Sequence, residues 1–218
     1  MKLIKLILIG ILLLFSTGYM LEIIDLFQNL PEFSSPVKQF AYGGLAFLVF
    51  WFLFRKRFMY TFSVFEHELT HVLVAKLFFL KTLRFEVSPR KHVEGQVVVG
   101  VEGRGTLTRF ISVFFSLAPY YLPTLTLLVF VLYALFGSRI APVFFFAVGF
   151  TAAYHFWTTF REFGFHQADI QKHGEYFSTA FVLLGNLIFL GVIMEVVVYS
   201  NFQDVPGFLV RGLLNVFM

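Results

Sequence analysis

The segment FEHELTHVLVAKLFF, residues 65–79, places two glutamates and two histidines in an otherwise apolar run. His67 and His71 are four residues apart, so a helix would bring both imidazoles to one face, one turn above the other. Two histidines in this arrangement can bind one Zn²⁺, and Glu68 beside the first can accept a proton from a metal-bound water. The sequence therefore predicts a helical zinc site of the pattern His-Glu-x-x-His, with Zn²⁺ as the cofactor.

The whole chain is very apolar, and this composition predicts an integral membrane protein. Of its 218 residues, 58% are hydrophobic and 14% are charged, whereas soluble domains have about 45–50% apolar and about 25% charged residues. The apolar residues form long blocks, which is typical of membrane-spanning segments. The net charge of +4 comes without a basic patch interleaved with aromatic residues, so we exclude nucleic acid as a partner. There are no cysteines, so any metal must be held by histidine and carboxylate.

The order of the blocks predicts an all-α polytopic membrane protein with about six transmembrane helices in a single domain, residues 1–218. Lys2 and Lys5 precede the first apolar run and no small-residue cleavage site follows it, so we expect a retained first helix over about residues 1–20. Residues 22–38 contain two prolines and three acidic residues, which predicts a polar loop. The other spans are expected at about residues 40–54, 58–80, 107–136, 140–160 and 177–199.

The pattern changes after the third expected span. Residues 83–105, LRFEVSPRKHVEGQVVVGVEGRG, alternate apolar and polar residues, are rich in valine and are interrupted by Pro89, Gly95 and Gly103. A period of two is typical of strands. We therefore predict a membrane-associated β-hairpin or small sheet, inserted at about residues 82–104 after the histidine-bearing helix.

The stretch from His67 to Pro89, HELTHVLVAKLFFLKTLRFEVSP, resembles the site-2 protease family of intramembrane zinc metalloproteases. Members carry His-Glu-x-x-His in a membrane helix, followed by a β-hairpin beside the active site, and the compact members without PDZ or CBS domains are the most similar. The resemblance implies a zinc metalloendopeptidase that hydrolyses a peptide bond in or near the transmembrane segment of a membrane-protein or peptide substrate. It implies Glu68 as the catalytic residue, and a location in the lipid bilayer of a bacterial inner (cytoplasmic) membrane.

A catalytic zinc needs a third protein ligand and an open position for water. The resemblance implies an aspartate on a later helix, usually within Leu-Asp-Gly, a motif that this chain lacks. Asp169, within FHQADIQKHG, is the only aspartate between Asp25 and Asp204 and precedes the last expected span. We therefore predict Asp169 as the third metal ligand, beside His67 and His71.

Other residues of the same polar segment offer alternative ligands. Glu162 would make a His-His-Glu site like that of membrane-bound gluzincins, and His166 or His173 would make a three-histidine site. Asp169 could instead only cap the helix that follows it. For the function, the alternative is a catalytically idle zinc-binding membrane partner or regulator.

Further polar residues and prolines predict features of the surrounding helices. Pro119 and Pro123 predict a bend that frees backbone carbonyls within the fourth span. Asn186 predicts an interhelical hydrogen bond, and His155 a polar contact inside the bundle rather than a metal ligand. Glu66 lies about 100° around the helix from its neighbour His67, so we expect it to pair with a basic residue or a histidine.

Overall fold

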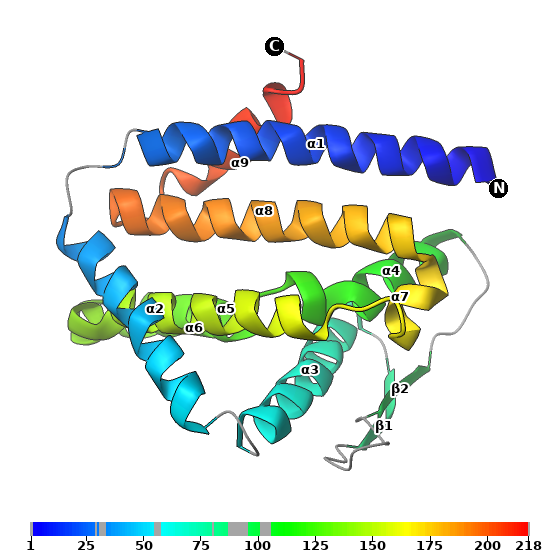
Figure 1. Cartoon of the computed structure of the whole chain (residues 1–218), viewed down its shortest axis with the longest axis horizontal. Helices are drawn as coiled ribbons and strands as arrows, with labels where there is room; N and C mark the ends of the chain where they lie inside the picture. The colour runs from blue at the N-terminus through cyan, green and yellow to red at the C-terminus, as the bar shows by residue number, and fades with distance from the viewer. Residues whose placement is uncertain are drawn as a thin grey trace.

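The computed structural model describes residues 2–28, 30, 34–54, 58–79, 81–86, 96–100 and 106–217. Helices make up most of this part of the chain, and the predicted helical class is confirmed (Figure 1). They are α1 (Lys2–Gln28), α2 (Ser35–Phe54), α3 (Phe58–Leu77), α4 (Thr106–Tyr121), α5 (Thr124–Phe136), the short 3₁₀ helix η1 (Gly137–Arg139), α6 (Ala141–Glu162), α7 (Ala168–His173), α8 (Glu175–Tyr199) and α9 (Val205–Leu214).

Two short strands follow α3. β1 (Lys81–Glu86) pairs antiparallel with β2 (Gln96–Gly100), and the register shifts between Thr82 and Arg84. The connection between the strands, like residues 101–105, lies outside the described residues. The continuous β-hairpin over residues 82–104 therefore stays a prediction.

In the described part of the chain, four helices are long and apolar enough to cross a membrane: α1, α2, α6 and α8. α4 and α5 bend by 87° at the break between them and together would make a fifth span. Against the six spans expected from the sequence, the described part of the chain thus offers four or five, and α3 is not among them. Its two glutamates and two histidines make α3 less apolar than the other long helices.

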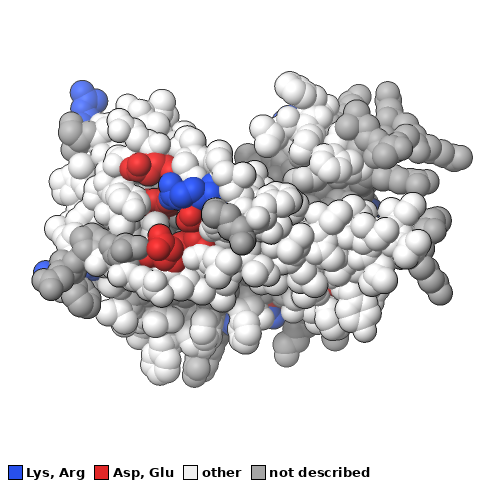
Figure 2. All heavy atoms as spheres, turned by 90° about the horizontal axis from the view of Figure 1, so that it is seen from above, with Lys and Arg blue, Asp and Glu red and all other residues white. Residues whose placement is uncertain are grey.

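α1 continues through Gln28, so the polar loop predicted over residues 22–38 is wrong for its first part. Glu22 is tolerated inside this helix because Arg211 of α9 binds its carboxylate, Nε to Oε1, at 2.9 Å. The same guanidinium donates from Nη2 to Glu195 of α8 at 2.8 Å. These ion pairs join α1, α8 and α9, and Figure 2 shows acidic and basic side chains grouped on this otherwise largely uncharged face.

α2 and α6 pack with their backbones in contact at two glycines. Gly43 lies against the carbonyl of Phe146, and Gly149 lies against the carbonyl of Phe40, so a Cβ at either glycine would collide with backbone. Small residues at helix crossings allow such close approach in membrane proteins. This contact holds α6, whose last turn reaches the candidate site, against α2.

Candidate metal centre

The three residues predicted as metal ligands come together in space. α3 places His67 and His71 on one face, with their ring centroids 5.0 Å apart. Asp169 of α7 faces both rings, with its Oδ2 at 3.4 Å from His71 Nε2 and at 3.8 Å from His67 Nε2. One ligand atom from each residue lies within 4.8 Å of the others, so this group could hold a metal ion.

The separations between these atoms suit a zinc ion. Ligand atoms at about 2.0–2.2 Å from a tetrahedral zinc are about 3.3 Å apart, close to the observed 3.4 and 3.8 Å. Both separations exceed the range of about 2.7–3.2 Å for N–H···O hydrogen bonds. The group therefore presents an anionic oxygen and two nitrogens to one common point.

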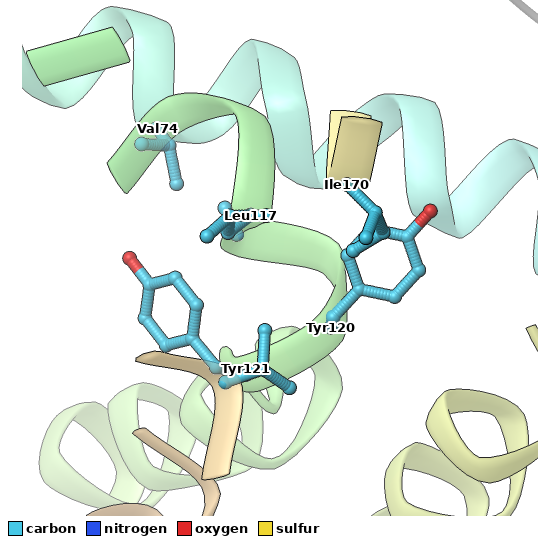
Figure 3. Close-up of a cluster of buried hydrophobic side chains, with 7 residues drawn as sticks. Val74, Leu117, Tyr120, Tyr121 and Ile170 are labelled. Atoms are coloured by element: carbon cyan, nitrogen blue, oxygen red, sulfur yellow. The ribbon is translucent and has the colours of Figure 1, made fainter. Parts of the chain in front are cut away.

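A buried apolar cluster sets the distance between α3 and α7. Val74 follows His71 by about one turn, and Ile170 follows Asp169 directly. Both belong with Leu117 of α4 to one cluster of buried apolar side chains (Figure 3). Leu117 and Ile170 are fully buried. Because well-packed side chains leave little freedom to the backbones that carry them, this cluster positions Asp169 opposite the histidines.

Asp169 lies in the first turn of α7 rather than at a helix cap. The N-cap of α7 is Gln167, and the N-cap of α8 is Gly174. Gly174 has a φ of 89°, a conformation that favours glycine, and there the chain turns from α7 into α8. The alternative in which Asp169 only caps a helix is therefore wrong.

A proline orients His71. Pro119 has no N–H, so the carbonyl of Phe115 lacks its usual donor within α4. His71 Nδ1 lies 2.9 Å from this carbonyl oxygen; because a carbonyl only accepts, Nδ1 carries the hydrogen. The lone pair of Nε2 then faces Asp169 and the point at which the three ligand atoms converge. Backbone carbonyls often orient metal-binding histidines in this way.

For a zinc ion held by this group, Pro119→Ala is expected to lower the affinity by about tenfold. The restored N–H of residue 119 would compete with His71 for the carbonyl of Phe115. Competition titration of the purified protein with a zinc chelator measures the effect. Pro123→Ala is the matched control, because it alters the same break without supplying a donor to Phe115. An equal loss of affinity in both variants would contradict this role of Pro119.

The break between α4 and α5 frees a second carbonyl. Thr124 N–H donates to Leu122 at 2.8 Å, so the carbonyl of Tyr120 accepts instead from Asn186 Nδ2, at 2.7 Å. Asn186 Oδ1 in turn accepts from His155 Nε2 at 3.2 Å. The bend, the interhelical bond of Asn186 and the bundle contact of His155 are thus confirmed.

Glu162 lies on the other side of His67. Its Oε2 is 3.8 Å from Nδ1 of that ring, whereas Asp169 faces Nε2. A carboxylate at the nitrogen opposite the metal is the usual means of orienting a metal-binding histidine. Among the described residues, Glu162, His166 and His173 all lie outside the three-residue group. The arrangement favours Asp169 as the third ligand. The Glu162 carboxylate lies beside Nδ1 of His67, at a distance longer than a direct hydrogen bond.

The two glutamates of α3 have different surroundings. Glu68 is buried and, with His67 and Glu162, lines a cavity of about 570 Å³. Glu66 accepts a hydrogen bond from the Thr70 hydroxyl at 3.2 Å, and the expectation of a basic or histidine partner stays a prediction. The Thr70 hydroxyl, one turn away on the same helix, thus gives the Glu66 carboxylate a local hydrogen-bond donor. Of the two, only Glu68 lines the cavity next to the metal-ligand group.

The fold and the site define a helical protein with apolar spans and a His-His-Asp group that could bind a metal. Compared with known proteins, the chain matches no protein-family model, no curated protein and no solved structure. Its function is therefore inferred from the geometry of this site.

Proposed function

We propose that this protein is an intramembrane zinc metalloendopeptidase, similar to the site-2 proteases, that hydrolyses a peptide bond in or near a transmembrane segment of its substrate. The observation that carries the proposal is the convergence of His67, His71 and Asp169 within 4.8 Å, with Glu68 following the first histidine. Two imidazoles and one carboxylate form a ligand set that suits Zn²⁺ and leaves a position open.

Each residue of the site has a defined task in this reaction. A zinc ion held there supplies Lewis acidity and activates water. Glu68, buried at the cavity wall, accepts the proton of the attacking water and then passes it to the leaving amine. The carbonyl of Phe115 holds His71 by a hydrogen bond at its Nδ1, which leaves Nε2 of that ring directed at the metal position. The negative charge of Glu162 lies on the Nδ1 side of His67.

The surroundings support a reaction at membrane depth. Carboxylates inside a bilayer are destabilising by roughly 2.5–3.5 kcal/mol each unless they find a partner. Glu68 and Asp169 lie in a chain with four or five apolar helices of membrane-spanning length. A bound divalent cation compensates the charge of the nearby carboxylates, which gives a physical reason for placing them there.

Metal analysis of purified variants tests the ligand set. Wild-type protein is expected to bind a single zinc ion, and Asp169→Ala to lose it because the site keeps only two ligands. Glu162→Gln is expected to retain zinc, with an affinity lower by about 10–100-fold. Elemental analysis gives the zinc content, and chelator competition gives the affinity.

The matched control is Asp204→Ala, at an exposed aspartate next to α9, which is expected to bind zinc like the wild type. Loss of zinc from Glu162→Gln together with its retention by Asp169→Ala would reverse the ligand assignment. Wild-type protein that binds no zinc would contradict the proposed function itself.

A further inference from the structure

A cavity of about 570 Å³ opens beside the metal-ligand group, between α2, α3, α6 and the segment after α6. Its volume lies within the range of about 300–1,000 Å³ that is typical of ligand pockets. His67 and Glu68 form part of its wall, so whatever occupies it contacts the proposed catalytic residues. Under the proposed function, the occupant is the substrate segment next to the scissile bond.

Two tryptophans and an arginine form one side of this cavity. Trp51 of α2 and Trp157 of α6 are in contact, with ring centroids 4.7 Å apart and planes inclined at 63°. The guanidinium carbon of Arg161 lies over Trp51, 5.8 Å from the ring centroid. A guanidinium that stacks on a ring keeps its N–H donors at the edge of its plane, where they can bind another group.

Arg161 is available to a ligand. Its side chain is exposed and makes no ion pair within the described part of the chain. The adjacent Glu162 directs its carboxylate to His67 instead. Arg161 therefore brings a positive charge to the cavity wall. Its neighbour on α6 is Glu162, whose carboxylate lies beside the proposed metal ligand His67.

We propose that Arg161 selects substrates that carry a carboxylate close to the scissile bond, and that this carboxylate enters the cavity beside Trp51. The proposal rests on the proposed peptidase function and adds a substrate class to it. Planar guanidinium groups bind carboxylates through two parallel hydrogen bonds. The carboxylate belongs to an acidic side chain or to a free C-terminus, since the two present the same chemistry to Arg161.

Peptide binding tests this selection separately from catalysis. The receptor is the full-length zinc-loaded Glu68→Gln variant in detergent, which cannot complete cleavage. The probes are fluorescent apolar peptides with glutamate at successive positions, their glutamine counterparts with amidated C-termini, and one glutamine peptide with a free C-terminus. Fluorescence anisotropy is expected to show about tenfold tighter binding for one of the carboxylate probes than for its neutral counterpart.

Variants at Arg161 give the decisive comparison. Adding Arg161→Gln is expected to bring the affinity ratio close to one, and Arg161→Glu to favour a lysine-containing peptide. Arg139→Gln, at an exposed arginine of η1, is the matched control and should leave the ratio unchanged. Equal binding of charged and neutral probes, or no binding of any probe, would overturn the inference. Selective binding without cleavage by the Glu68-containing protein would instead contradict only the peptidase function.

Discussion

Glu68→Gln is expected to lower peptide-bond cleavage by about 10²–10⁴-fold, the usual contribution of a general acid–base residue. Glutamine has nearly the same shape as glutamate but cannot take up the proton of the attacking water. Under the proposed function zinc should remain bound, because the proposed ligand atoms belong to His67, His71 and Asp169. The measurement is cleavage of apolar transmembrane-length peptides in detergent, with products identified by mass spectrometry, beside the zinc content of the same samples.

The control for this variant is Glu175→Gln, which changes an exposed glutamate in the first turn of α8. It is expected to retain both activity and metal. Cleavage by Glu68→Gln at the wild-type rate would exclude Glu68 as the base. Zinc binding without cleavage in the wild type as well would favour the alternative of an idle metal-holding partner, in which Glu68 has no catalytic task.

Arg211→Met is expected to lower the free energy of unfolding by about 3 kcal/mol, the low end of the effect of breaking a buried ion pair. The substitution leaves the buried carboxylates of Glu22 and Glu195 without their cation. Glu195 is 0% exposed, and its Oε2 has no hydrogen-bond partner within the described residues. The value is not higher because 48% of the Arg211 side chain is exposed, and solvent weakens exposed pairs. Denaturant titration in detergent, followed by circular dichroism, measures the change.

Two further variants separate charge from packing at this position. Arg139→Met removes an exposed arginine that makes no ion pair with the described residues, and it should change stability by less than about 0.5 kcal/mol. Adding Glu22→Gln and Glu195→Gln to Arg211→Met should restore most of the lost stability, because no uncompensated charge then remains buried. Without that recovery, the effect of Arg211 would come from the packing of its aliphatic stem.

Several parts of the site could be predicted because they depend on neighbours in the chain. The spacing of His67 and His71 has a direct meaning on a helix, and the apolar residues around them predict that helix. Pro119 and Pro123 likewise predict the bend between α4 and α5, since neither residue can donate a backbone hydrogen bond. In each case the chemistry acts within a few residues.

Other features escaped prediction because their partners are far away in the sequence. Glu22 suggested a loop, yet it lies inside α1, since Arg211, 189 positions later, binds its carboxylate. The sequence predicted six spans, whereas the described part of the chain offers four or five. α3 has the length of a transmembrane helix, but its polar residues serve the site and lower its hydropathy.

The sequence by itself determined the helical class, the two imidazoles on one face and a short list of candidates for the third ligand. Only the tertiary structure shows which of those candidates lies where. It places Asp169 near the Nε2 atoms of both histidines and Glu162 near Nδ1 of one. It also decided which nitrogen of His71 carries the hydrogen, through the carbonyl of Phe115. The physical reason is that these choices depend on distances across packed helices, which the residue pattern along a single helix does not specify.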